Sequence, residues 1–266
     1  MSLAPLGWSL ETYSSFVPWA VFLFGLLLAS FLNALMYRLD KGFKYPGILV
    51  KPSHCEKCKK ELRWFDLIPV VSFLISKGKC SQCGKKVFWF YPLSEIVLGI
   101  SMYAFYVNGV APELYVVLLL LFGMSYFDVL YRAVPKWLIH LGLVVGVLYS
   151  IWKYLAGAEL VLSGLFVAAI VSGVFLLLNL LKKSFGLGDL LIIIFVGLFL
   201  SHEFVILFLL GAVFSGALYG VFLVIKDRKN LKATIPFVPF LYIGFVISVC
   251  GGDFLWQLFA KGLPLW

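Results

Sequence analysis

Charge is scarce in this sequence. Charged residues make up 13% of its 266 positions and hydrophobic residues 62%, whereas soluble globular proteins have about 25% and about 45 to 50%. This composition excludes a soluble globular domain, and the mean hydropathy of +1.02 agrees. Because a membrane-crossing helix needs roughly 20 apolar residues, we expect an all-α polytopic membrane protein with about eight transmembrane helices and one small polar module between the first and the second.

Basic residues are absent from positions 1–18, so no cleavable signal peptide is expected. Of the 22 Lys and Arg residues, 20 fall in the stretches 38–86, 132–136, 182–183 and 226–232. Their alternation with the apolar runs puts all four stretches on one face of the membrane, and the positive-inside rule makes that face cytoplasmic. The N-terminus and the C-terminus are then both expected outside. The net charge of +9 reflects this topology, and no nucleic-acid partner is expected.

The same pattern divides the chain into three segments. Residues 1–37 hold a short outer segment and the first transmembrane helix, which we expect from about Trp19 to Tyr37. Residues 38–92 form a basic cytoplasmic loop. Residues 93–266 form a helical membrane domain. One apolar run of that domain, Leu190 to Leu200, has 11 residues, which is short for a full crossing because about 17 to 25 are usual.

Cysteine is also rare, and four of the five cysteines lie in the basic loop. They form two CxxC pairs, Cys55 with Cys58 and Cys80 with Cys83, separated by 21 residues. On the reducing side of a membrane such pairs bind metal more often than they form disulfides. Four thiolates complete a closed tetrahedral shell, so we predict a structural zinc site. A redox role is the alternative.

Two aspartates, Asp128 and Asp189, lie at the expected cytoplasmic ends of apolar runs. An ionisable residue in such a run costs about 2.5 to 3.5 kcal/mol at the bilayer centre and is by default a functional candidate. Two carboxylates at equal depth can share one proton, so that one activates a water and the other polarises a peptide carbonyl, as in aspartic proteases. Structural roles stay open as well: Asp189 as a helix N-cap and Asp128 as the partner of Arg132.

Short motifs along residues 25–245 occur in the order of one known family. They are Ser30-Phe31-Leu32-Asn33, Trp64-Phe65-Asp66-Leu67-Ile68-Pro69 between the CxxC pairs, Tyr91-Pro92-Leu93-Ser94-Glu95, Phe127-Asp128, Gly186-Leu187-Gly188-Asp189 and Pro236-Phe237-Val238-Pro239-Phe240. The Gly-x-Gly-Asp turn resembles that of the membrane aspartic proteases. The whole set resembles the bacterial type IV prepilin peptidases.

The resemblance implies an enzyme with two activities. It would cleave the basic leader of prepilins or pseudopilins at the cytoplasmic face of the bacterial inner membrane, with Asp128 and Asp189 as catalytic residues. It would then methylate the new N-terminal amine with S-adenosylmethionine, an activity associated with the loop at 38–92. No S-adenosylmethionine fingerprint is visible there, and the cofactor-binding residues stay unknown. The active-site motif would further include Gly186, Gly188, Pro236, Phe237 and Pro239.

Three motif residues, Asn33, Asp66 and Glu95, receive no role from the resemblance. By itself, Asn33 is typical of a hydrogen bond between membrane helices. Glu95, one turn into a helix, is typical of a carboxylate that complements the helix dipole. The sequence also departs from the family at two positions, because Lys136 stands where an aspartate is usual and Leu191 where a lysine is usual.

Other classes of function stay open from the residues alone. A proton-coupled transporter would use the two aspartates as relay carboxylates, but the internal repeats that transporters often show are not found. A zinc-dependent assembly factor without catalysis would have the four cysteines as its functional core. Membrane lipids are expected to contact the basic loop, and no motif predicts an oligomeric state.

Overall fold

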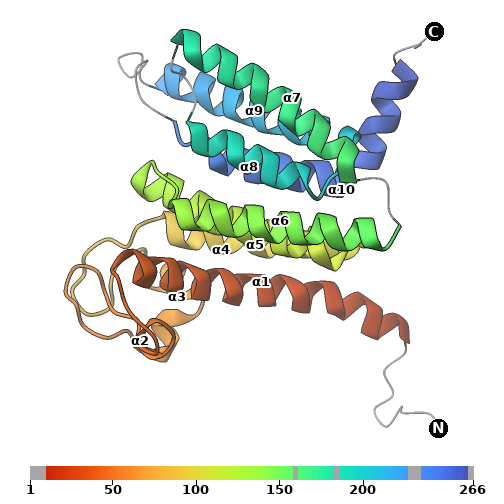
Figure 1. Cartoon of the computed structure of the whole chain (residues 1–266). Coiled ribbons are helices and arrows are strands. Elements are labelled where there is room, and N and C mark those ends of the chain that lie inside the picture. Colours follow the sequence, from red (N-terminus) through yellow and green to blue (C-terminus); the bar gives the residue numbers. More distant parts are fainter. Residues whose placement is uncertain (1–9, 158–160, 183–185, 227–234, 263–266) are drawn as a thin grey trace. The chain divides into compact units, whose positions relative to one another are not determined.

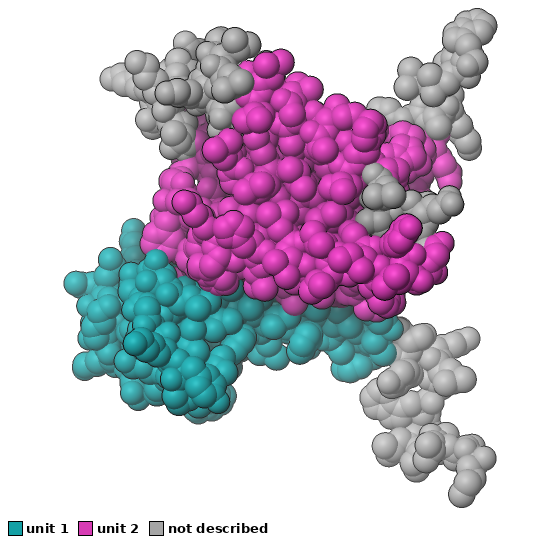
Figure 2. Space-filling model, viewed as in Figure 1, with its two compact units in different colours: residues 1–109 teal, residues 110–266 magenta. Residues whose placement is uncertain are grey.

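The computed structural model describes residues 10–157, 161–182, 186–226 and 235–262. The expectations for residues 1–9, Lys183 and most of the basic stretch 226–232 lie outside these ranges. Across the described ranges the chain is helical, and extended pairing is limited to two isolated bridges. It divides into two compact units, residues 1–109 and residues 110–266 (Figure 2).

The long helices follow the apolar runs of the sequence (Figure 1). Unit 1 holds α1 (Leu10–Asp40) and α4 (Phe90–Val107), and unit 2 holds α5 (Pro112–Tyr131), α6 (Lys136–Leu155), α7 (Val161–Lys182), α8 (Leu187–Gly197), α9 (His202–Lys226) and α10 (Val238–Gly262). In the described ranges six helices are long and apolar enough to cross a membrane, namely α1, α4, α5, α6, α9 and α10. Two shorter apolar helical stretches are Ser163–Val174, which lies in α7, and Leu187–Gly197, which is α8. The expected class, an all-α polytopic membrane protein, is confirmed.

The first helix begins earlier than the sequence predicts, at Leu10 rather than near Trp19. Pro18, which we expected at the entrance of the span, lies inside the helix. Residues 10–17 contain no glycine and no second proline, so nothing in them ends a helix. A proline removes one hydrogen bond of the helical ladder, and membrane helices tolerate this loss.

In unit 1, α1 and α4 pack side by side through glycine. A Cβ atom at Gly25 would lie 2.8 Å from the Cα atom of Gly99, so neither position has room for a side chain. Helices without a larger residue at the crossing can bring their backbones together, which is a common way for membrane helices to associate. This contact fixes the registry of the two helices that flank the basic loop.

The basic loop between α1 and α4 contains only short elements: α2 (Gly47–Val50), the 3-10 helix η1 (Trp64–Leu67) and α3 (Val71–Ile75). Arg38, in the last turn of α1, holds the start of the loop. Its guanidinium donates hydrogen bonds of 3.0 Å to the carbonyl of Ile48 and 2.6 Å to the carbonyl of Lys51. Since the last carbonyls of a helix lack partners within it, Arg38 supplies donors that α2 needs.

In unit 2, contacts between neighbours join six helices into a ring in the order α5, α6, α8, α7, α9, α10 and back to α5. The short α8 is well buried within this ring, with Ile192 and Phe195 fully inaccessible. Glycines of α6 make room for it, because a Cβ atom at Gly146 would lie 2.7 Å from the side chain of Leu198. At about 1.5 Å per residue α8 is about 16 Å long, roughly half of the hydrocarbon core of about 30 Å.

Candidate active site and metal centre

Asp128, the first predicted catalytic residue, lies in the last turn of α5 and is 9% exposed. Its Oδ2 atom accepts a hydrogen bond of 2.9 Å from the backbone N–H of Val238. The backbone of Phe237 donates to the same carboxylate. Because a buried carboxylate without donors is costly, this aspartate depends on the beginning of α10, a segment 110 positions away.

Proline explains why the amide of Val238 is available. The first N–H groups of a helix have no partner inside it, and α10 begins at Val238. Pro239 has no N–H, and the N–H groups of Phe240 and Leu241 donate to the carbonyl of Phe237 at 3.0 and 3.2 Å. The N–H of Val238 is thus left for Asp128. A helix N-terminus also favours a negative charge nearby.

Asp189, the second predicted catalytic residue, is the third residue of α8. Its carboxylate accepts a hydrogen bond from the backbone N–H of Gly186, the N-cap residue of that helix. This is the acidic half of a capping box. The negative charge of Asp128 acts on Asp189 across the unit, so the fold brings the two carboxylates into one electrostatic site.

The structural roles considered from the sequence are also present. The backbone hydrogen bond to Gly186 makes Asp189 a capping residue, although at the third helical position rather than at the N-cap. The positive charge of Arg132 attracts Asp128. Neither role separates the two carboxylates, and a pair that interacts this way titrates jointly. Such a pair can hold one proton between two acids, which is the arrangement that acid-base hydrolysis requires.

The two glycines beside the second aspartate leave little room for a side chain. A Cβ atom at Gly186 would lie 3.3 Å from Oδ2 of Asp189, and one at Gly188 would lie 3.3 Å from Cδ1 of Ile139 in α6. Both distances are tighter than an ordinary van der Waals contact. The two glycines of the motif therefore make room for different neighbours. Gly186 makes room for the carboxylate of Asp189, and Gly188 makes room for the adjacent helix α6.

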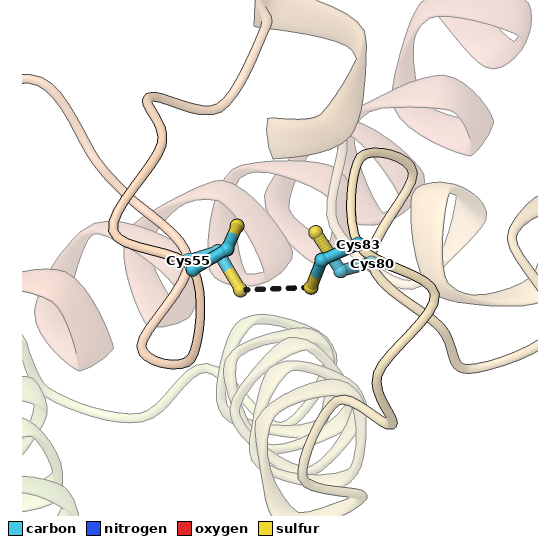
Figure 3. Close-up of side chains that lie close together, drawn as sticks. Cys55, Cys80 and Cys83 are labelled. Carbon is cyan, nitrogen blue, oxygen red and sulfur yellow. Dashed lines mark hydrogen bonds between the residues drawn. The ribbon is translucent and has the colours of Figure 1, made fainter.

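The four predicted metal ligands come together in unit 1. The sulfur atoms of Cys55, Cys58, Cys80 and Cys83 lie within 4.8 Å of one another. Figure 3 shows Cys55 and Cys83 facing each other, with their Sγ atoms 4.0 Å apart. Tetrahedral zinc with Zn–S bonds of about 2.3 Å requires sulfur atoms about 3.8 Å apart. The donor set and its spacing fit a divalent soft metal ion.

Both CxxC pairs use the same backbone turn. In each, the first cysteine, Cys55 or Cys80, donates its N–H to the carbonyl five residues later, and its own carbonyl accepts from the N–H four residues later, at 2.8 to 3.0 Å. That fourth residue has a positive φ, 61° at Lys59 and 67° at Gly84. The left-handed conformation suits glycine and strains lysine. The repeated turn presents two sulfur atoms from each side.

Two family models match the chain, one in each unit. The Bacterial Peptidase A24 N-terminal domain matches residues 23–108, and the Type IV leader peptidase family matches residues 115–221. This chain belongs to the bacterial type IV leader peptidase family. The first match contains the cysteine cluster, and the second contains both aspartates.

Relatives of the family are similar over nearly the whole chain. The Bacillus subtilis (strain 168) prepilin leader peptidase/N-methyltransferase is 28% identical over 252 residues, covering 91% of this chain and 97% of the relative. The enzyme of the same name from Pseudomonas putida is 28% identical, covering 91% and 92%. That of Myxococcus xanthus (strain DK1622) is 27% identical, covering 93% and 74%. No solved structure matches the chain.

The motif residues without an assigned role all lie in unit 1 of this leader peptidase family member. Asn33 of α1 donates a hydrogen bond of 2.8 Å to the hydroxyl of Ser94 in α4, which is the interhelical role expected from sequence. Asp66 accepts from both the backbone and the side chain of Arg63 at 3.2 Å. It thereby caps η1, the 3-10 helix between the two cysteine pairs.

Glu95 has a role that its sequence position does not indicate. Its Oε2 atom accepts a hydrogen bond of 2.8 Å from the backbone N–H of Val70. The hydroxyl of Ser30 in α1 donates to the same carboxylate. Sequence reasoning missed Ser30, Val70 and Ser94 as partners; Ser30 and Ser94 were visible as members of the quoted motifs, but Val70 carried no side-chain signal.

One of the two departures from the family pattern, Leu191, points away from the carboxylate of Asp189. Leu191 is 36% exposed, whereas Leu190 and Ile192 are buried. Positions two apart on a helix point about 200° away from each other, so the residue at 191 does not face Asp189. Lys136 begins α6, where its side chain extends the basic character of the loop after α5.

Proposed function

We propose that this protein is an intramembrane aspartic endopeptidase that cleaves the basic leader of type IV prepilins or pseudopilins, and that it methylates the N-terminal amine so exposed. The observation that carries the peptidase proposal is the electrostatic interaction of Asp189 with Asp128, whose carboxylate the first turn of α10 holds. Membership of the leader peptidase family favours this function over a transporter or an assembly factor.

The two aspartates act as one acid-base unit. With one proton between them, the ionised carboxylate takes a proton from a water molecule and the protonated one donates to the carbonyl oxygen of the scissile peptide. The backbone N–H groups of Phe237 and Val238 hold Asp128 in place during this exchange. Because Gly186 has no side chain, the backbone beside Asp189 is left uncovered, and an extended substrate can approach it.

The site lies at the cytoplasmic face in this proposal. Arg132 and Lys136 follow the end of α5 that carries Asp128, and basic residues flank the cytoplasmic ends of membrane helices. Both termini would then lie outside, and the cysteine cluster inside. A prepilin offers a basic leader in the cytoplasm and an apolar helix in the bilayer, so its scissile bond lies at the same depth as the aspartates.

The cysteine cluster holds a structural zinc ion in this proposal. Cys55, Cys58, Cys80 and Cys83 are its ligands, and the ion ties the two halves of the loop together. S-adenosylmethionine would supply an electrophilic methyl group to the second activity. The loop in unit 1 is assigned to this activity because the corresponding family domain, matched at residues 23–108, is separate from the domain with the aspartates.

The test is cleavage of a purified prepilin by the purified chain in detergent, followed as a gel shift. We expect Asp128→Asn and Asp189→Asn each to reduce cleavage by a factor of about 10³ or more, because each removes one member of the acid-base pair. Asparagine keeps an oxygen that can accept from the Val238 amide at position 128 and from the Gly186 amide at position 189, so both variants should fold. Glu203→Gln, at the start of α9, is the matched control. A dyad variant that cleaves at the normal rate would defeat the assignment.

A further inference from the structure

Unit 1 contains a buried polar cluster that the peptidase chemistry does not use. Asn33 is 4% exposed and Glu95 7% exposed. Asn33 lies one turn after Ser30 on α1, and Glu95 follows Ser94 on α4. Hydrogen bonds join the two helices twice, from Asn33 to Ser94 and from Ser30 to Glu95. We call these four residues the acceptor cluster.

The hydrogen-bond network fixes the orientation of the Asn33 amide. The hydroxyl of Ser94 has a single proton, and it donates that proton to the carbonyl of Tyr91 at 2.8 Å. Ser94 can therefore only accept from Asn33, so the NH₂ group of Asn33 faces it at 2.8 Å. The Oδ1 atom of Asn33 is buried and has no hydrogen-bond partner. A buried acceptor without a donor is destabilising.

Glu95 lacks a positive partner. Its carboxylate accepts from Val70 and Ser30, which fills about two of its roughly four acceptor positions. Within the described part of the chain no lysine, arginine or histidine forms an ion pair with it. A buried carboxylate is normally paired or bound to a cation. Asn33 and Glu95 thus both offer acceptors, and an ionised Glu95 would have no positive partner among the described residues.

The backbone over Glu95 is strained. Val70 has φ 61° and ψ −50°, a conformation that is an outlier for a β-branched residue. The N–H of Val71 donates to the carbonyl of Pro69, so Val70 is the centre of the strained form of the γ-turn. This turn aims the Val70 N–H at the carboxylate. Strain of this kind persists where surrounding structure enforces it and is frequent at ligand sites.

We propose that the acceptor cluster binds a primary ammonium group, namely the N-terminal α-amine that leader cleavage exposes, and presents it for methylation. An ammonium supplies what the cluster lacks: a positive charge for Glu95 and N–H donors for Oδ1 of Asn33. A sulfonium group is positive but has no N–H donor, so it would leave Asn33 unsatisfied. The proposal rests on the methyltransferase activity proposed above.

The chemistry of methylation requires a proton acceptor at this point. An α-ammonium has no lone pair, so one N–H bond must break before the nitrogen can react, and the Glu95 carboxylate takes up the proton as a new O–H bond. The lone pair of the amine nitrogen then forms the N–C bond to the methyl group of a sulfonium donor. At the same time the C–S bond breaks and leaves its electron pair on sulfur. Glu95 touches the reacting nitrogen in this scheme, and Asn33 orients it.

The experiment measures binding of synthetic peptides to the full-length chain in detergent micelles by calorimetry. One peptide reproduces the N-terminus of a cleaved prepilin with a free α-amine, a second is N-acetylated, and a third is N-acetylated but carries a lysine side chain. We expect the wild type to bind the first about tenfold or more tightly than the other two, because a charge-assisted contact is lost. Equal binding of the lysine peptide would instead assign the cluster to leader lysines and overturn the proposal.

Two variants separate the proposed role from a structural one. Glu95→Gln keeps an oxygen for the Val70 amide but removes the charge, so it should lose the preference for the free amine and methylate about 10² times more slowly. Ser101→Ala, at another buried hydroxyl of α4, removes a hydrogen bond to the carbonyl of Val97 but leaves the acceptor cluster unchanged, so it should keep the preference. Both should cleave leaders at the wild-type rate.

The outcomes are distinct from those for the peptidase. A wild type that cleaves prepilin but binds the free and acetylated peptides equally would overturn the ammonium site and leave the dyad intact. The same holds if Glu95→Gln retains the preference. A wild type that does not cleave prepilin at all would count against the proposed function, while the peptide preference would still test the acceptor cluster.

Discussion

Each unit buries one carboxylate under a backbone amide supplied by a distant proline-containing segment. In unit 1 the donor is Val70, which follows Pro69, and the acceptor is Glu95 at 2.8 Å. In unit 2 the donor is Val238, and the acceptor is Asp128 at 2.9 Å. The two arrangements solve the same problem, because a charge inside a membrane helix needs donors that the helix itself cannot provide.

The difference lies in what stands beside the carboxylate. Asp128 interacts with a second acid, Asp189, and the like charges of the two carboxylates repel each other. The pair can therefore hold and transfer a proton. Glu95 follows Ser94, which binds the neutral amide of Asn33 with its unsatisfied oxygen, so the cluster favours binding a donor. Similar backbone support therefore serves acid-base chemistry in one unit and, as we propose, recognition of an amine in the other.

Removing zinc should give the largest effect and should separate the two units. We expect about one zinc per chain by elemental analysis, and chelation should unfold the loop, because structural zinc contributes about 10 to 16 kcal/mol in small zinc-binding peptides. Limited proteolysis of the chelated chain should then cut within residues 41–89, while prepilin cleavage by the aspartates continues. Unchelated protein with less than about a tenth of a zinc per chain would contradict the tetrathiolate site.

Gly186→Ala should impair the aspartate pair of unit 2 selectively. The new Cβ atom would lie 3.3 Å from Oδ2 of Asp189 and displace the carboxylate, and small misplacements of catalytic groups reduce rates by as much as about 10². We expect prepilin cleavage to fall by roughly 10 to 100-fold while methylation of a precleaved peptide persists. Gly173→Ala in α7 is the matched control, since no atom lies within 4 Å of its Cβ position. Equal activity of both variants would mean that Gly186 does not protect the carboxylate.

Val70→Gly should have the opposite effect to these changes, because it should stabilise unit 1. Glycine adopts positive φ without strain, so releasing the β-branched side chain should raise the stability of the loop by about 1 kcal/mol. The temperature at which the full-length chain releases zinc to a dye measures this. Leu74→Gly, inside the helix α3, should lower that temperature, because glycine weakens a helix interior. A lower release temperature for Val70→Gly would show that the turn is not strained.

The smallest effect should come from Asp66. Desolvation by burial raises the pKa of Asp66, but hydrogen bonds from Arg63 and Ser81 outweigh it and leave the pKa below its usual value. A lowered folded pKa contributes stability above the unfolded pKa of about 3.9, and this is lost as the pH falls through the folded value. Against Asp66→Asn, the wild-type loop should lose its advantage below about pH 4 in acid-unfolding curves. Parallel curves for the two proteins would contradict the prediction.

Much of the fold was readable from the apolar runs. The short apolar run from Leu190 to Leu200, for example, is α8, Leu187–Gly197. The predicted start of α1 was wrong, because the prediction took Pro18 as a helix boundary. Local rules about proline hold less strictly in a long membrane helix, where neighbouring structure compensates for one missing hydrogen bond.

The candidate sites were predicted as residues but not as networks. The spacing of the CxxC pairs was enough to predict the cysteine cluster, because each pair fixes its own local turn. The partners of Glu95 and Asp128 were not predictable, since Val70 and Val238 take part through their backbone N–H groups, which every residue except proline carries. No side-chain pattern distinguishes a valine whose amide caps a carboxylate from one that only packs.

The sequence by itself determined the membrane class, the approximate position of the long apolar helices and the identity of the chemical groups, because hydrophobicity and ligand chemistry belong to residues. Only the tertiary structure decided which carboxylate interacts with another acid and which backbone N–H groups reach each carboxylate. Asp128 and Asp189 interact because the fold of unit 2 brings the end of α5 towards the start of α8, and the N-terminus of α10 supplies an amide to Asp128. Charge repulsion and hydrogen bonding act over a few ångström, and such distances between remote residues exist only after folding.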